Sequence, residues 1–168
     1  MMTTIIAVEK PSGVIFGCDS QTTGFGKYAK EGPKFFKNGE VVFAIAGRAR
    51  LAQEIKYATV PRVKGDVFTY VHKVLVPFID KACERAALDK DENEFIVSVR
   101  GKVFEIQVDR NVSRRADGVY GIGSGSAWAV AYLTAAETIN VNTVQKALEV
   151  AAYHDPYTSS PFYVVEGL

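Results

Sequence analysis

The segment TTIIAVEKPSGVIFGCD, residues 3–19, decides the fold of this 168-residue chain. Residues 3–8 are rich in β-branched side chains, which favour extended backbone. Residues 10–13 read Lys-Pro-Ser-Gly, the composition of a turn, and residues 14–18 return to an apolar strand. The segment therefore predicts a β-hairpin.

Beyond this hairpin, strand-like patterns recur along the chain. Residues 34–46 hold an Asn-Gly turn between two apolar runs, which is a strong hairpin signal. Residues 95–108 show the same pattern around an Arg-Gly turn, which predicts a third hairpin. Short apolar strands are predicted at residues 119–122 and 162–165. Residues 20–33 are polar and contain several glycines, so we expect a loop or an irregular ribbon there.

Helical spacing of apolar residues replaces the strand pattern after Gly47. One helix is predicted up to Pro61, and a second begins at the N-cap candidate Asp66. The apolar face of the second helix is expected to consist of Val67, Tyr70, Val71, Val74, Phe78 and Ala82. Pro77 lies inside this pattern, so it is expected either to kink the helix or to begin a new one.

Two further helices are predicted near the end of the chain. An alanine-rich helix covers residues 127–136, and Asn142 is the candidate cap of the next. The apolar stripe of that last helix is Val144, Ala147, Leu148 and Ala151. The order of strands, two helices, strands, two helices and strand is typical of α+β layers and not of alternating βαβ units. It favours a core of two sheets with helices outside, in one domain over residues 3–168.

Composition narrows the class of protein. The formal charge is +1, and 48% of residues are apolar, as in an ordinary globular protein. A nucleic-acid partner is not expected, because no basic excess or basic run is present. The apolar runs fall short of a membrane span and the first residues lack the features of a secretory signal, so a cytoplasmic location is expected. Cys18 and Cys83 are predicted to be small buried thiols.

Thr3 is a candidate nucleophile because only two methionines precede it. A threonine hydroxyl attacks poorly unless a base accepts its proton. The free α-amine of an N-terminal threonine is such a base and titrates at roughly 7.7–8.0. Residues 1–2 are expected to be a removable leader whose loss frees this amine. Taken alone, Thr3 is better explained as a β-forming residue at the start of a strand.

Two charged residues are placed to support such a nucleophile. Asp19 follows the apolar run of the second strand, so its carboxylate is expected at the sheet end near Thr3. Lys34 opens the next hairpin. An ammonium held between a carboxylate and a hydroxyl lowers the pKa of a neighbouring amine and hydroxyl. A turn-capping role for Asp19 and a solvated role for Lys34 are the alternatives.

Glycines mark two further candidate segments. Gly47 follows an apolar run and lets the backbone approach a ligand, with its N–H toward a developing oxyanion. Residues 123–126, Gly-Ser-Gly-Ser, lead into a helix, where hydroxyl and N–H groups stabilise an amine or an anion. This second segment lacks the spacing and the lysine of a phosphate loop. Each segment alone also fits an ordinary turn.

In combination these features resemble the β-subunits of proteasomes. The resemblance rests on TTII at residues 3–6, Gly-x-Asp at 17–19, Lys34 before two apolar residues, FAIAG at 43–47 and GIGSGS at 121–126. It covers nearly the whole chain in the order and spacing of that family. The bacterial peptidase HslV is the closer look-alike, because its threonine also lies just behind the initiator methionine.

The resemblance implies a four-layer αββα sandwich of the N-terminal nucleophile hydrolase type and a threonine-type peptidase. Thr3 matches the nucleophile, with its own α-amine as the base. Asp19 and Lys34 match the supporting charge pair. Gly47 matches the oxyanion donor, and Ser124 matches the serine that hydrogen-bonds near the amine. The resemblance implies no metal and no cofactor.

Further roles follow from the same resemblance. Asp155 and Thr158 match, more loosely, the late aspartate and hydroxyl pair of the family. An unfolded polypeptide substrate is expected to bind as an added strand near Thr23 and the oxyanion glycine. Ile45 and Ala49 are expected to line an apolar pocket for the residue before the cut. Apolar or aromatic residues are therefore the expected preference.

Three features depart from the family pattern. Cys18 stands where the family commonly has a small or acidic residue. The segment from Lys34 to Gly47 is shorter than in HslV, so Lys30 competes for the role of the catalytic lysine. The double methionine is a poor substrate for methionine excision, so translation from Met2 or self-cleavage is the expected route to a free Thr3.

Two other functions fit parts of the sequence. A non-catalytic shell or scaffold subunit would keep residues 1–2, although such a subunit needs neither the charge pair nor the oxyanion glycine. A small-molecule amide hydrolase of the same fold would need a pocket closed to peptides. A cysteine hydrolase is disfavoured, because only His72 and His154 are available as bases for Cys18 and neither lies in a suggestive motif.

Assembly is implied by the resemblance as well. Subunits of this family form stacked rings with the threonines inside, through heterologous contacts that close. A separate ATP-dependent unfoldase is the expected partner for folded substrates, because the chain has no nucleotide-binding motif of its own.

Overall fold

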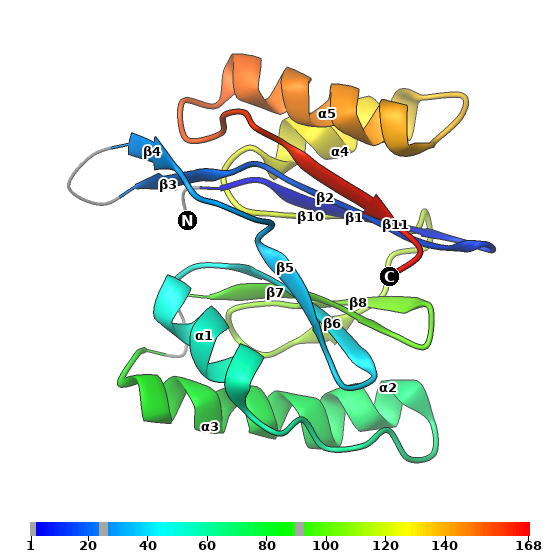
Figure 1. Cartoon of the computed structure of the whole chain (residues 1–168). Coiled ribbons are helices and arrows are strands. Elements are labelled where there is room, and N and C mark those ends of the chain that lie inside the picture. The colour runs from blue at the N-terminus through cyan, green and yellow to red at the C-terminus, as the bar shows by residue number, and fades with distance from the viewer. Residues whose placement is uncertain (1–2, 24–26, 90–92) are drawn as a thin grey trace.

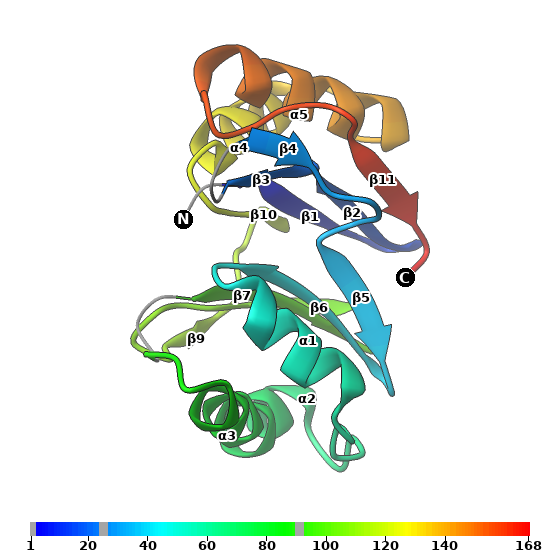
Figure 2. The same ribbon diagram turned by 60° about the vertical axis from the view of Figure 1, so that its left-hand side comes forward.

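Two antiparallel sheets lie face to face in the computed structural model, with helices on both outer surfaces (Figure 1). The structure describes residues 3–23, 27–89 and 93–168. The helices near the end of the chain cover one sheet, and the earlier helices cover the other, as the turned view also shows (Figure 2). The predicted four-layer αββα sandwich is confirmed.

The first sheet has the strand order β10-β1-β2-β11. Its strands are β1 (Ile5–Lys10), β2 (Gly13–Cys18), β10 (Val119–Ile122) and β11 (Tyr163–Glu166). The predicted hairpin is the β1–β2 pair, in which Ile5 opposes Cys18. The two short predicted strands extend this sheet on either side, each antiparallel to its neighbour.

The second sheet has the order β5-β6-β7-β8-β9. Its strands are β5 (Phe35–Asn38), β6 (Val41–Ala46), β7 (Glu94–Val99), β8 (Lys102–Ile106) and β9 (Val112–Ser113). Both predicted hairpins are present, but β8 ends at Ile106, two residues before the predicted end. The polar segment forms a two-stranded ribbon of β3 (Gln21–Thr23) and β4 (Lys27–Ala29).

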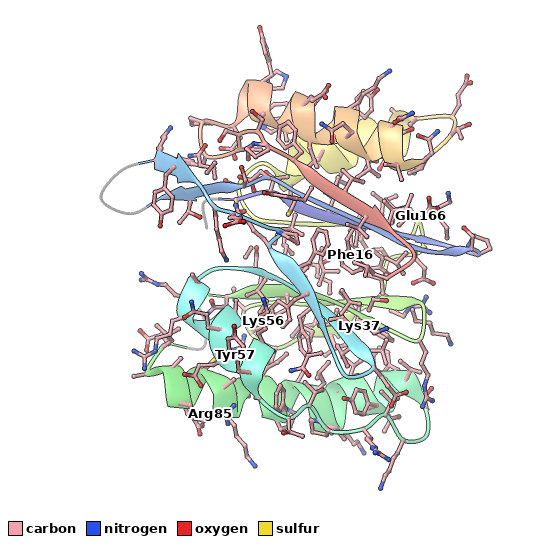
Figure 3. The ribbon with its side chains drawn as sticks, in the orientation of Figure 1. Phe16, Lys37, Lys56, Tyr57, Arg85 and Glu166 are labelled. Atoms are coloured by element: carbon pink, nitrogen blue, oxygen red, sulfur yellow. The ribbon has the colours of Figure 1, made fainter. Side chains whose placement is uncertain are left out.

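Three apolar clusters hold the layers together. The central one fills the space between the sheets and includes Phe16, which Figure 3 shows there. Each outer cluster joins one sheet to its helices. The start of β1 and the end of β2 are therefore buried, which fixes Thr3 before β1 and Asp19 after β2.

The helices over the second sheet differ in part from the prediction. They are α1 (Ala49–Tyr57), α2 (Val67–Tyr70), the π-helical turn η1 (Val71–Leu75) and α3 (Val76–Ala86). Asp66 caps α2 as predicted, since its carboxylate accepts the Thr69 N–H at 2.8 Å. Pro77 lies in the first turn of α3. The prediction that Val74 faces the core was wrong: the wide π turn shifts the phase, so Val74 is exposed and Leu75 is buried.

The helices over the first sheet are α4 (Ser126–Ala135) and α5 (Val141–His154). The predicted stripe of α5 is fully buried. The predicted cap at Asn142 was wrong. Asn140 caps the helix instead, because its side chain accepts the Thr143 N–H while the Thr143 hydroxyl accepts the Asn140 N–H. No helix in the three described ranges is long and apolar enough to cross a membrane.

Candidate active site

The site forms where the hairpin meets the second sheet. Thr3 lies just before β1, Asp19 lies just after β2, and Lys34 lies just before β5. Asp19 N–H donates to Thr4 O at 3.1 Å, which continues the β1–β2 pairing beyond the strands. Pairing of the hairpin strands therefore places Asp19 opposite the first described residues, as the sequence predicts.

Three side chains meet at one point. Thr3 Oγ1 donates to Asp19 Oδ1 at 2.7 Å. Lys34 Nζ donates to the same carboxylate oxygen at 2.7 Å and also to Thr3 Oγ1. Its third bond goes to Gln21 O at 2.6 Å. The Thr3 hydroxyl is thus held between an acid and an ammonium.

The Asp19 carboxylate is fully buried and fixed by the backbone. Its Oδ1 also accepts the Thr4 N–H at 2.9 Å, and its Oδ2 accepts the Gln21 N–H at 3.0 Å. Charge-assisted bonds of this kind are stronger and shorter than neutral ones. The carboxylate is therefore a preorganised anion that holds Lys34 in place.

Lys34 differs from the alternative Lys30 in its contacts. Lys34 is mostly buried and bonded to both Thr3 and Asp19, whereas Lys30 is exposed. Burial lowers the pKa of Lys34 below its usual value, and the attraction of Asp19 opposes that shift. The geometry therefore favours Lys34 for the role that the sequence left open between the two lysines.

A second polar group lies on the other side of the Thr3 backbone. Ser124 Oγ donates to Asp155 Oδ2 at 2.8 Å and to Thr3 O at 3.4 Å. Thr158 Oγ1 donates to the same Asp155 oxygen at 2.6 Å and lies 2.6 Å from Thr4 Oγ1. The structure thus brings Ser124, Asp155 and Thr158 together beside Thr3, as the resemblance implies.

Thr4 belongs to this polar group but was not singled out from the sequence. Side chains of successive strand residues point to opposite faces. Thr3 therefore faces Asp19 and Lys34, while Thr4 is buried against Thr158. The repeated threonine in TTII was the available signal, since its second hydroxyl also needs a partner once it is buried.

Gly125 permits the close packing of this polar group. A Cβ at this position would lie 2.2 Å from Thr4 Oγ1, 2.6 Å from Thr158 Oγ1 and 2.9 Å from Asp155 Oδ2. Gly125→Ala is therefore expected to lower the free energy of unfolding by about 1–3 kcal/mol, as overpacking does. Urea denaturation followed by circular dichroism measures this, and an unchanged midpoint would contradict the packing described.

Gly47 lies between β6 and α1, with a φ of +150° that favours glycine. The adjacent Arg48 N–H donates to Asn93 Oδ1 at 2.9 Å. Asn93 is fully buried and anchors this turn from the start of β7. Sequence reasoning missed Asn93, because a single asparagine in a polar segment gives no signal of its burial.

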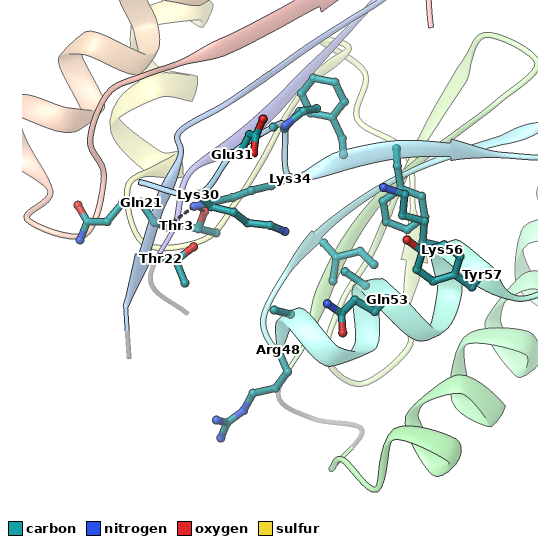
Figure 4. Close-up of a pocket in the computed structure, with 17 residues that line it drawn as sticks. Thr3, Gln21, Thr22, Lys30, Glu31, Lys34, Arg48, Gln53, Lys56 and Tyr57 are labelled. Atoms are coloured by element: carbon teal, nitrogen blue, oxygen red, sulfur yellow. Dashed lines mark hydrogen bonds between the residues drawn. The ribbon is translucent and has the colours of Figure 1, made fainter. Parts of the chain in front are cut away.

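A cavity of about 500 Å³ opens beside Thr3 (Figure 4). Thr3 and Lys34 lie at one end, and Lys56 and Tyr57 of α1 lie at the other. Ile45 and Ala49, the two residues expected in the substrate pocket, both line this cavity. The neighbouring apolar side chains that also line it are Ala52, Phe35 and Phe36. The side chain of Thr23, the third expected substrate contact, lies outside the described residues.

Cys18 lies directly behind the charge pair but is not a second nucleophile. The side chain is fully buried, and burial raises the pKa of its thiol to about 12. The thiol is therefore protonated at neutral pH, which makes it unreactive. Cys18 and Cys83 are both buried thiols, as predicted. Among the described residues, no cluster of three or more His, Cys, Asp or Glu is arranged to hold a metal ion.

The layer order is shared with solved structures of proteasome-like proteins, which have the N-terminal nucleophile hydrolase fold. A BPH protein of Thiobacillus denitrificans, solved in complex with epoxomicin, superposes with a TM-score of 0.77 at 19% identity, over 97% of this chain and 98% of that one. HslV of Trypanosoma brucei gives a TM-score of 0.68 at 23% identity, over 97% and 98%. Anbu of Yersinia bercovieri gives 0.72 at 14% identity, over 97% and 80%.

Sequence comparison adds nothing to this. No protein-family model matches the chain, and no curated protein sequence matches it either. At these identities the structural likeness shows the fold, and the chemistry has to be argued from the site.

Proposed function

We propose that this chain is a threonine-type endopeptidase subunit of a self-compartmentalising, proteasome-like protease. The observation that carries the proposal is the contact of Thr3 Oγ1 with both Asp19 and Lys34. A scaffold subunit has no need of a buried carboxylate and ammonium directed at one hydroxyl. Burial of an ion pair is costly even when the two charges are paired, so the pair argues for a functional role.

In the proposed reaction the free α-amine of Thr3 accepts the hydroxyl proton, and Oγ1 attacks the peptide carbonyl. The Lys34 ammonium stabilises the developing alkoxide, and Asp19 holds that ammonium in place. The carbonyl oxygen becomes an oxyanion near the Gly47 N–H. The protonated amine then gives its proton to the leaving amine, and an ester on Thr3 remains. Water, activated by the same amine, hydrolyses the ester.

Maturation is part of this proposal. The amine is a base only after the bond between residues 2 and 3 is broken, because an amide nitrogen is not basic. Ser124 donates to Thr3 O and to Asp155, so it is placed to orient the freed terminus. Translation from Met2 or self-cleavage would supply the mature chain.

The cavity beside Thr3 is proposed to take the side chain before the cut. Its walls include Ile45, Ala49 and Ala52, so apolar or aromatic side chains are the proposed preference. The proposed substrate is an unfolded polypeptide, bound as an added strand near β3.

The proposed assembly is a set of stacked rings in the cytoplasm, served by a separate ATP-dependent unfoldase. One similar structure is described as a helical assembly of the Anbu complex from Pseudomonas aeruginosa, which supports the proposed self-association. Analytical ultracentrifugation tests this, and a monomer at micromolar concentration would argue against it.

Activity and intact mass together test the function. We expect the purified protein to lack both methionines and to hydrolyse fluorogenic peptides that end in tyrosine or leucine, with epoxomicin as an inhibitor. A full-length mass with no hydrolysis favours the shell subunit. A processed protein that hydrolyses only small amides favours the small-molecule amide hydrolase of the same fold. Preference for acidic ends would contradict the proposed pocket.

The pH dependence of hydrolysis follows from the two titrating groups. Activity is expected to rise as the α-amine loses its proton, at roughly 7.7–8.0 for an unperturbed amine. It is expected to fall again as Lys34 loses its proton. Since burial lowers the pKa of Lys34, the alkaline fall should lie below about 10.4, the usual value of a lysine. A kcat/KM profile measures both limbs, and activity that keeps rising above that pH would contradict an essential ammonium.

A further inference from the structure

The segment Lys30–Lys34 connects β4 to β5 and forms one wall of the cavity beside Thr3. All five of its residues are described, and none belongs to a helix or a strand. Its last residue nevertheless supplies the ammonium that contacts Thr3 Oγ1. The position of that ammonium therefore depends on what holds an irregular segment in place.

Two side chains accept hydrogen bonds from the backbone N–H groups at the end of this segment. Gly32 N–H donates to the Tyr163 hydroxyl at 3.0 Å, and Lys34 N–H donates to Cys18 Sγ at 3.2 Å. Pro33 lies between them and has no N–H. Both amide donors of this tripeptide are thus occupied. The segment's other end is held separately, since Lys30 N–H donates to a backbone carbonyl at 2.8 Å.

The two acceptors are a pair in the first sheet. Tyr163 of β11 and Cys18 of β2 are direct partners in the antiparallel register. Their spacing is therefore set by the sheet, which gives the segment a rigid base. Gly32 has a φ of +81°, a conformation that favours glycine and that the bond to Tyr163 helps to hold.

We propose that Cys18 and Tyr163 are positioning residues that fix the Lys30–Lys34 segment, with Cys18 setting the place of the lysine and Tyr163 the width of the cavity. The part that concerns substrate rests on the proposed peptidase function. This positioning role explains a residue that departs from the family pattern, Cys18. A neutral thiol is suited to this role, because it accepts the N–H without adding a charge beside Asp19 and Lys34.

Tyr163→Phe tests the cavity wall, because it removes one hydroxyl and keeps the ring. KM for peptides that fill the cavity is expected to rise about fivefold, the equivalent of one hydrogen bond, while kcat stays within about twofold. Tyr70→Phe is the matched control. Its hydroxyl donates to Pro61 O at 2.6 Å under the outer helices, so the kinetics should not change. Equal KM values for Tyr163→Phe and the wild type would overturn this part.

Cys18→Ala tests whether Cys18 holds Lys34 in place, and Cys18→Ser is the variant that is expected to rescue the loss. The alanine variant is expected to lower kcat about fivefold and to move the alkaline limb to lower pH, because a less firmly held ammonium loses its proton more readily. The serine hydroxyl accepts the same N–H, so Cys18→Ser should restore most of kcat and return the alkaline limb toward its wild-type pH. An alanine variant with the wild-type kcat and pH profile would overturn the role of Cys18.

Amide hydrogen exchange tests, independently of catalysis, whether Cys18 and Tyr163 hold the segment in place. The Gly32 amide should exchange about fivefold faster in Tyr163→Phe, and the Lys34 amide about fivefold faster in Cys18→Ala, while the amides of β5 are unchanged. Wild-type rates at both amides would overturn the proposal. If the wild type hydrolyses no peptide, the peptidase function fails, whereas these exchange rates still decide whether the pair holds the segment.

Discussion

Thr3→Ala in the mature protein is expected to lower kcat/KM for peptide hydrolysis by about 10⁴-fold or more, the order of loss that follows removal of a nucleophile. The variant keeps the α-amine, the Asp19–Lys34 pair and the cavity. The change removes Oγ1 with its two hydrogen bonds, and the Cγ2 methyl group. The free energy of unfolding should fall by no more than about 1–2 kcal/mol, so the loss of activity is not a loss of fold.

Thr3→Ser is the control for this prediction, because it keeps both the hydroxyl and the amine. It should retain activity within about tenfold of the wild type, and intact mass must show the same processing in each protein. If Thr3→Ala hydrolyses peptides at the wild-type rate, then another group is the nucleophile. The proposed function would then be wrong, whereas the fold would stand.

The fold was largely predictable, because its strongest signals are local. The Asn-Gly turn between residues 34 and 46 and the apolar alternation around residues 95–108 each specify a hairpin without long-range information. The buried stripe of α5 follows from helical spacing alone. Pairing of the first hairpin also placed Asp19 opposite Thr4 and so next to Thr3, since register is fixed once both strands are known.

What escaped prediction depends on contacts between distant segments. The π turn at Val71–Leu75 and the cap at Asn140 differ from the predicted pattern by a few residues at most, which propensity does not resolve. Asn93 and Tyr163 act on loops far from them in sequence. Their partners are backbone N–H groups, which carry no residue-specific signature. A sequence pattern identifies charge pairs more readily than such anchors.

Lys34→Met is expected to lower kcat by about 10²–10³-fold, because among the described residues it removes the cation that is bonded to both the Thr3 hydroxyl and the buried acid. Without that ammonium, no hydrogen bond from Lys34 compensates the negative charge that develops on Thr3 Oγ1 beside the buried Asp19 carboxyl group. The developing alkoxide would therefore lose its stabilisation. The loss should therefore fall on kcat more than on KM, which single-turnover kinetics with saturating peptide measures.

Lys30→Met is the matched control, since Lys30 lines the same cavity and belongs to the same segment. It removes an equal charge a few residues away, but among the described residues its side chain forms no hydrogen bond or ion pair with Thr3 or Asp19. A loss of at most about tenfold, mainly in KM, is expected because only the general field of the cavity changes. The opposite result, with Lys30→Met the more damaging variant, would show that the mature site rearranges and that Lys30 is the catalytic lysine. Asp19 would then pair with Lys30 in the mature site, and with Lys34 only before the bond between residues 2 and 3 is cleaved.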